Sequence, residues 1–281
     1  MFDFFANLFG YALNAIYNLV NNYGIAIILF TIGLKLIMLP ISIKQQETMK
    51  KTAKVQEKVK EIQEKFSSDP VRMNQEMMDV YKQENVSPLG GCFTSIIQFI
   101  IILSIFFLVS KPLTYMKHVD KETISKYASE ISQEKGEALR YEEIAIIKEK
   151  SGEDSNVSLN MNFLGLDLSD VPTENLTDIR VFIIPTLYVI TSIASTKLTT
   201  SLNKKKEGAK EERKEEKAND GKQTQEEVLD DMNKQMGIMM PIMSVSIALI
   251  APLGLALYWL VSNLLMIIER LVINKVCKEE E

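Results

Sequence analysis

Long apolar runs alternate with charged segments along this chain. Five apolar runs are candidates for membrane-crossing helices: Gly24–Ile43, Gly91–Ser110, Val181–Thr196, Gly237–Ala251 and Leu253–Ile268. The last two contain roughly 15–16 residues each, about 24 Å of helix against a hydrocarbon core of about 30 Å, and only Pro252 separates them. The pattern predicts an all-α polytopic membrane protein with five transmembrane helices, of which the last two form a tight hairpin.

Two further helical patterns flank the first run. Residues 1–23 place aromatic and aliphatic side chains at helical spacing, but four asparagines interrupt them, which predicts an amphipathic helix at the membrane interface. A further partial span is the alternative. Residues 44–87 form two amphipathic arms around the break Ser67–Pro70, where Asp69 suits a helix N-cap and Pro70 the first helical position. We therefore expect a helical hairpin there.

These patterns divide the chain into ten segments. They are an interfacial helix (1–23), spans at 24–43, 91–110, 180–199, 236–251 and 253–273, the helical hairpin (44–87), a loop (111–179), a charged loop (200–235) and a tail (274–281). The loop 111–179 is acidic, with one or two helices expected within Lys121–Lys150 and a loop-like stretch from Asn156 to Asn175. Lysines crowd the ends of spans one, three and five, so the positive-inside rule places the N-terminus outside and the C-terminus, with the 44–87 hairpin, in the cytoplasm.

Composition removes several functional classes. Hydrophobic residues make up 46% and charged residues 25% of the chain, and the net charge of −5 argues against a general nucleic-acid binder. One histidine and two isolated cysteines offer almost no material for a metal site, Cys–His catalysis or a disulfide framework. We therefore set these classes aside and expect no cofactor.

Lys35 is the only charged side chain deep inside any of these runs. It lies roughly 16 Å along a helix from Gly24 and roughly 12 Å from Ile43. An ammonium at that depth costs about 2.5–3.5 kcal/mol on insertion scales, so such residues usually face a bundle interior or a wet cavity. Because the other four runs contain no Asp or Glu, we expect water, backbone or an incoming anionic group to compensate the charge. The alternative is that the amine snorkels to the cytoplasmic headgroups.

Four motifs, in order along the chain, resemble the YidC family of membrane protein insertases. They are GLKLIMLP followed by the charged hairpin, SPLGGCFTSIIQF, FLGLDLS, and the closing run MMPIMSVSIALIAPLGLALYWLVSN. The resemblance implies an insertase of the bacterial plasma membrane, with a hydrophilic groove that is open to cytoplasm and lipid but closed to the outside. The basic residue of that groove falls on Lys35, where bacterial members usually have arginine. Lysine keeps the positive charge but loses the planar fork.

Polar side chains on the apolar runs are the other groove candidates. We select Thr31, one turn from Lys35, together with Gln98, Ser192, Tyr258 and Trp259. Interhelical hydrogen bonding is the alternative role for the first three, and a place in the interfacial aromatic belt for the last two. Four methionines of the hairpin could capture apolar substrate segments or fill the seam between its arms: Met49, Met73, Met77 and Met78.

These observations predict a non-enzymatic insertase that moves short hydrophilic tails across the bilayer and releases their helices into lipid. Its expected partners are nascent membrane proteins and the bilayer, with the ribosome and the Sec translocon as further candidates and no specific nucleic acid. Two other classes stay open: a transporter or proton-coupled channel in which Lys35 titrates, and a scaffold that recruits other membrane proteins. A transporter would need a second ionisable group, and a scaffold leaves Lys35 unexplained.

Overall fold

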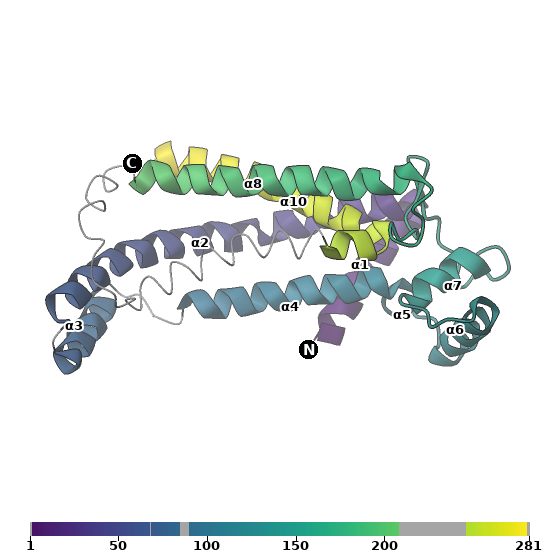
Figure 1. Cartoon of the computed structure of the whole chain (residues 1–281), viewed down its shortest axis with the longest axis horizontal. Coiled ribbons are helices and arrows are strands. Elements are labelled where there is room, and N and C mark those ends of the chain that lie inside the picture. Colours follow the sequence, from purple (N-terminus) through teal and green to yellow (C-terminus); the bar gives the residue numbers. More distant parts are fainter. Residues whose placement is uncertain (1, 68, 85–89, 208–245, 280–281) are drawn as a thin grey trace. The chain divides into compact units, whose positions relative to one another are not determined.

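Helices make up most of the residues that the computed structural model describes, which are 2–67, 69–84, 90–207 and 246–279 (Figure 1). The helices are α1 Phe2–Val20, α2 Tyr23–Lys65, α3 Pro70–Gln83, α4 Gly90–Ser110, α5 Pro112–Tyr115, α6 Lys121–Lys135, α7 Glu142–Lys150, the 3-10 helix η1 Ile179–Phe182, α8 Ile183–Glu207 and α10 Leu253–Glu279. Two short strands, β1 Asn162–Phe163 and β2 Leu166–Asp167, pair antiparallel. The chain forms two compact units, residues 1–6 with 33–106 and residues 7–32 with 107–281, which are described separately below.

Three stretches of the described residues are long and apolar enough to cross a membrane. They are Tyr23–Gln45 in α2, Ile179–Leu198 in η1 and α8, and Leu253–Val272 in α10. The apolar part of α4, Phe99–Ser110, is shorter, and most of the expected span 236–251 lies outside the described residues. The prediction of a helical membrane protein is therefore confirmed, whereas the five-span count stays a prediction.

The α2–α3 hairpin is the distinct feature of the first unit. α2 continues through Pro40 to Lys65 as one helix, and α3 then returns along it. Buried Val55 and Val59 form the seam, against which three side chains of α3 pack: Met77, Val80 and Tyr81. Asp69 caps α3 by accepting a hydrogen bond from the Arg72 amide at 3.1 Å, and Pro70 occupies the first turn, as the sequence predicts.

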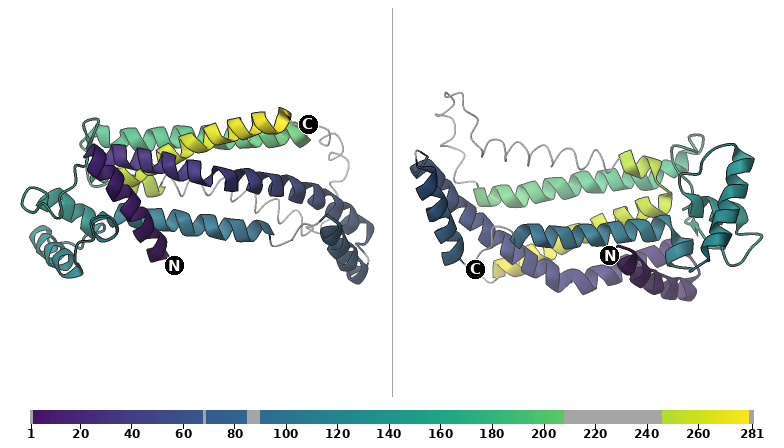
Figure 2. Two further views of the ribbon diagram at one scale, coloured as in Figure 1. Left: turned by 180° about the vertical axis from the view of Figure 1, so that it is seen from behind. Right: turned by 90° about the horizontal axis from the view of Figure 1, so that it is seen from below.

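In the second unit, α8 and α10 pack side by side along their lengths (Figure 2). The rings of Tyr188 and Trp259 meet across this contact with centroids 6.0 Å apart. Ser195 and Asn263 are also buried, at 5% and 8% exposure. The pair therefore combines aliphatic packing with a small number of enclosed polar groups.

Residues 111–178, which we call the loop domain, form a small folded body between α4 and α8. α6 packs against α7, with Ile124, Ile131 and Ile147 buried between them and the rest of the domain. Asp120 caps α6, and Gly136 ends it with a left-handed φ of 69°. One or two helices were expected within Lys121–Lys150, where α6 and α7 lie, whereas the stretch Asn156–Asn175, expected to be loop-like, contains the short β1–β2 hairpin.

α1 approaches the loop domain very closely at Gly10. A Cβ atom at this position would lie 1.9 Å from the carbonyl oxygen of Tyr115. Leu13, one turn further along α1, is fully buried, as is Met116. Glycine is therefore required where the helix backbone lies against α5.

Candidate functional site

Lys35 lies on α2 within the Tyr23–Gln45 span and is partly buried. Thr31, one turn earlier, is 1% exposed, and its hydroxyl donates to the Ile27 carbonyl at 2.6 Å. This hydrogen bond satisfies the hydroxyl within its own helix, which is the local alternative available to threonine in a membrane span. The two residues belong to different units of the chain, so a shared role in one groove stays a prediction.

The candidates on α8 and α10 all lie in the second unit. Tyr258 is buried and hydrogen-bonded to Ser262, while Trp259 is partly buried against Tyr188. Ser192 is partly buried, and its carbonyl accepts from the Thr196 hydroxyl at 3.0 Å. Tyr258 and Trp259 thus contribute to packing between and within these helices.

The remaining candidates lie in the first unit. Gln98 belongs to α4, and the side chains of Gln98 and Met49 lie outside the described residues. Met73 is partly buried and Met77 packs onto the Val55–Val59 seam, whereas Met78 is 50% exposed. Met77 therefore fills the seam between the two arms, whereas Met78 is exposed and remains a candidate for contact with substrate.

Within the loop domain, residues 157–173 bind the corner between α1 and α2. We call this segment the clasp. Asn160 is its centre: its amide donates to the Tyr17 hydroxyl at 2.8 Å, and its side chain donates to the Asn21 carbonyl at 2.8 Å. Its carbonyl accepts from the Tyr23 amide at 2.9 Å. Asn22 adds a side-chain bond to the Asn162 carbonyl at 2.7 Å.

The other half of the clasp binds the start of α10. The carbonyls of Leu168 and Asp170 accept from the amides of Gly254 and Leu253, each at 2.9 Å. These amides belong to the first turn of a helix and have no partner within it, so the clasp supplies their acceptors. One short segment therefore links the first turns of α2 and α10. The sequence carried no local signal for these contacts, since the partners lie more than 80 residues apart.

A buried carboxylate lies where the loop domain meets the end of α4. Glu143 on α7 is 5% exposed and accepts from both the Thr114 amide, at 2.9 Å, and the Thr114 hydroxyl, at 2.6 Å. Burial raises the pKa of Glu143 above its ordinary value, while these bonds and the charge of Lys111 act in the opposite direction. The carboxylate thus accepts the hydrogen bonds of Thr114 in α5 and connects this helix to α7.

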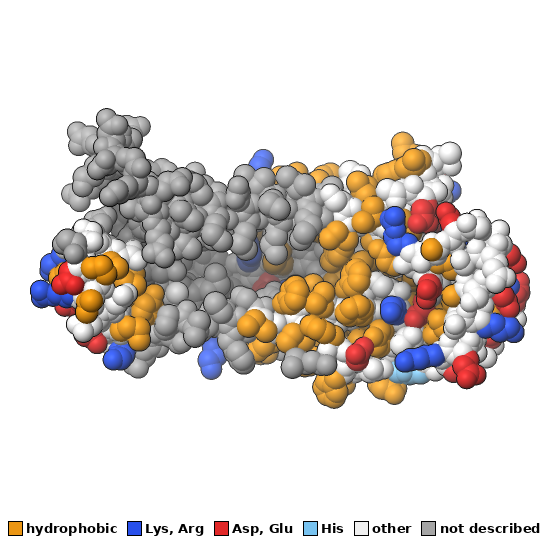
Figure 3. Space-filling view, turned by 60° about the horizontal axis from the view of Figure 1, so that its bottom comes forward, with side chains coloured by type: hydrophobic (Ala, Val, Ile, Leu, Met, Phe, Trp, Pro, Cys, Tyr) orange, Lys and Arg blue, Asp and Glu red, His pale blue; other side chains and the backbone are white. Residues whose placement is uncertain are grey.

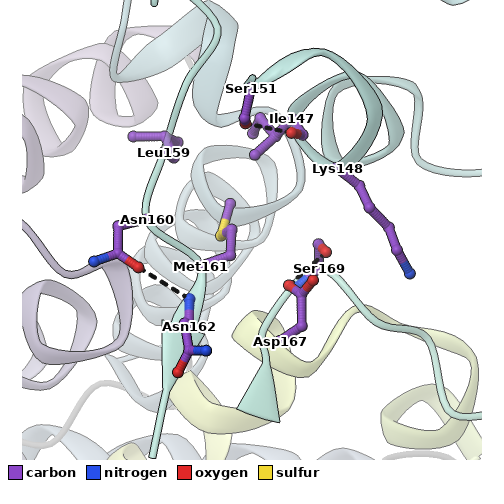
Figure 4. Close-up of a pocket in the computed structure, with 9 residues that line it drawn as sticks. All are labelled: Ile147, Lys148, Ser151, Leu159, Asn160, Met161, Asn162, Asp167 and Ser169. Carbon is purple, nitrogen blue, oxygen red and sulfur yellow. Dashed lines mark hydrogen bonds between the residues drawn. The ribbon is translucent and has the colours of Figure 1, made fainter. Parts of the chain in front are cut away.

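A pocket of about 250 Å³ opens beside the clasp (Figure 4). It is lined by residues of α7 and of the clasp: Ile147, Lys148, Ser151, Leu159, Asn160, Met161, Asn162, Asp167 and Ser169. Its polar groups mostly bond to one another or to neighbours, as with Lys148 and Asp170 at 2.6 Å and Ser169 with Asp167 at 2.6 Å. Within the described residues no group of three or more His, Cys, Asp or Glu side chains could hold a metal ion.

The apolar spans and the charged helical hairpin define a class: helical, multi-pass membrane proteins. Residues 15–280 match the family model of the 60Kd inner membrane protein, and the chain belongs to this family. It is therefore a multi-pass bacterial membrane protein.

Among curated proteins, the chain is similar to proteins named membrane protein insertase YidC. Examples come from Francisella tularensis subsp. novicida (strain U112), Francisella tularensis subsp. holarctica (strain LVS) and Francisella philomiragia subsp. philomiragia. Each is 38% identical over 109 residues, which is 39% of this chain and 20% of the relative. The matched region thus spans about a fifth of the length of these relatives.

Proposed function

We propose that this chain is a membrane protein insertase that acts without covalent chemistry. The observation that carries the proposal is Lys35, a cation within a membrane span of a chain that belongs to this family. The names of the curated relatives support the same activity. The substrates are nascent membrane proteins with a short hydrophilic tail, and the surrounding bilayer receives their apolar helices.

In this mechanism Lys35 lies in a hydrophilic groove together with Thr31, Gln98, Ser192, Tyr258 and Trp259. Acidic residues of the tail are attracted to the ammonium, and water in the groove reduces the penalty for moving polar groups partway across the bilayer. The substrate helix then leaves sideways into lipid because burial of its apolar surface is favourable. No bond is formed or broken.

The proposed orientation places the N-terminus outside and the α2–α3 hairpin in the cytoplasm. Lysines that follow the α2 and α8 spans support it, since they lie within the residues that weigh most in the positive-inside rule. Met78, exposed on α3, is then available to contact an apolar nascent segment in the cytoplasm. The ribosome and the Sec translocon are candidate partners on that side. The loop domain and the clasp lie on the outer side.

Reconstitution into liposomes tests the proposal. Single-span substrates with an acidic or a neutral tail are offered to the wild type, Lys35→Arg and Lys35→Ala, and protease protection of the tail is measured. We expect Lys35→Arg to retain insertion of both substrates, and Lys35→Ala to lose the acidic one by more than the neutral one. Equal insertion of both substrates by Lys35→Ala would remove the electrostatic role. No insertion by the wild type, with solute flux in its place, would favour a transporter.

A further inference from the structure

We propose that the tip of the β1–β2 hairpin, together with Leu176, inserts into the lipid leaflet next to the loop domain and anchors this domain to the membrane surface. The inference needs only that α2, α8 and α10 cross a bilayer, and it is independent of insertase activity. It rests on two leucines whose exposure is unusual for their domain.

The loop domain otherwise buries its large apolar side chains. Across residues 111–178, all of which the structure describes, the only large apolar side chains that are strongly exposed are Leu164, at 87%, and Leu176, at 69%. The side chains of Ile124, Ile131 and Met116 in the same domain are exposed by 8% or less. The two exposed leucines therefore gain nothing from packing within the chain.

Leucine is also an unfavourable residue type at position 164 of this turn. It occupies the first position of the two-residue turn between Phe163 and Leu166, with φ of 53°, and Gly165 follows with φ of 81°. Two positive φ values mark a turn that favours Asn, Asp or Gly at this position, because a larger side chain is strained there. A leucine that is both strained and exposed requires a stabilising contact outside the chain.

The hairpin is held at the level where a membrane span begins. The Phe163 ring packs onto Gly24, where an added Cβ would lie 2.5 Å from ring atoms, and Asn22 donates to the Asn162 carbonyl. Tyr23 is the first residue of the α2 span, so the turn of the hairpin lies beside the end of a lipid-facing helix. The neighbour that this position offers to Leu164 is lipid.

Leu176 occupies a similar place at a second span. It lies three residues before Ile179, which begins the α8 span and is 82% exposed. Both exposed leucines of the loop domain thus lie close to the first residues of a span, and neither lies on α6 or α7. Their place beside the spans points to the acyl and glycerol region of the bilayer as the occupant.

Charge does not supply this attachment. The loop domain contains 14 acidic and 8 basic residues, and charged side chains gather over the end that α6 and α7 form (Figure 3). A net charge of −6 over these residues is repelled by anionic headgroups. Apolar insertion at Leu164 and Leu176 is the attachment that remains favourable on such a surface.

Thiol reactivity in nanodiscs, in which both membrane faces are accessible, tests the inference on the full chain. Cys92 and Cys277 are first replaced by serine, and single cysteines are then placed by Leu164→Cys, Leu176→Cys and, as a matched control, Ser125→Cys on the exposed face of α6. Each variant is treated with a charged, membrane-impermeant maleimide. We expect the thiols at 164 and 176 to react much more slowly than the thiol at 125.

A second measurement distinguishes lipid from protein as the cause of slow reaction. A fluorophore attached at position 164 is expected to lose emission when spin-labelled phospholipid is added to the disc, while a fluorophore at 125 keeps its emission. Equal maleimide rates at 164 and 125, or slow reaction at 164 without lipid quenching, would overturn the assignment. Protection at 176 alone would also overturn it for the hairpin tip.

Discussion

Replacement of Gly10 by alanine should separate α1 from the loop domain. The added Cβ would lie 1.9 Å from the Tyr115 carbonyl oxygen and 2.6 Å from its carbonyl carbon. Real Cβ contacts essentially never fall below 3.0 Å, so the two backbones must move apart by about 1.1 Å. Neither neighbour is the flexible end of a side chain, and the strain cannot be relieved by a rotamer change.

Overpacking of this kind typically destabilises a protein by about 1–3 kcal/mol. A shift of α1 also loosens Leu13, which is fully buried on the same helix. Since each kcal/mol changes the melting temperature by roughly 2–4 °C in a chain of this size, we expect Gly10→Ala to unfold about 2–12 °C below the wild type. The measurement is thermal unfolding of the full chain in detergent.

Gly33→Ala is the matched control. Gly33 also lies inside a helix, but apart from its chain neighbours and the nearby backbone of that helix, no atom of the described residues lies within 4 Å of the position its Cβ would take. Alanine should stabilise that helix by up to about 1 kcal/mol through backbone propensity alone. If Gly10→Ala unfolds at or above the temperature of the wild type, as Gly33→Ala should, the close approach of α1 to α5 is refuted.

Two further predictions concern the loop domain and the hairpin. Glu143 has a raised folded-state pKa, so its ionisation opposes folding and its effect on stability improves as the pH falls from about 7 toward about 5. Glu143→Gln should lack this gain. As the pH falls over that range, the melting temperature of the wild type should therefore rise relative to that of Glu143→Gln. A difference between the two melting temperatures that stays constant with pH would contradict the prediction. In α3, Met77→Ala should increase tryptic cleavage of the α2–α3 hairpin because Met77 packs on Val55 and Val59. Met78→Ala should leave cleavage unchanged and, if Met78 contacts substrate, reduce insertion.

Local signals in the sequence were sufficient to predict the long helices and the α2–α3 hairpin. The Asp69–Pro70 pair predicted the start of α3, because both a cap and a helix-compatible proline act within one turn. The apolar runs predicted the α2, α8 and α10 spans for the same reason: burial in lipid is a property of consecutive residues.

The clasp could not be predicted in this way. Asn160 bonds to residues about 140 positions earlier, and an asparagine in a polar loop looks the same whether or not it has such partners. The β1–β2 hairpin has two residues in each strand, too few for an alternating pattern to be recognised. Its one available signal was the Leu164–Gly165 pair, since glycine marks a turn between apolar residues.

The bounds of α10 change one part of the reasoning about Lys35. The apolar run Leu253–Ile268 contains no acidic residue, but the α10 span extends to Val272 and therefore includes Glu269 and Arg270. The predicted span 253–273 includes the same carboxylate, so the expectation that the other spans contain none applies only to the shorter apolar run. An acidic side chain inside a span is costly unless it faces other helices or water, so Glu269 belongs with Lys35 among the groups that polar surroundings must accommodate.

The clasp gives a physical reason why a groove in this protein would open to one side. It connects the first turn of α2, through Tyr23, to the first turn of α10, through Leu253 and Gly254, with backbone hydrogen bonds that do not depend on side-chain identity. Lys148 and Asp170 then connect the clasp to α7, in an ion pair at 2.6 Å. Helices joined at one end can separate only at the other. In the proposed orientation the joined ends are the outer ones, so we propose that the groove opens toward the cytoplasm.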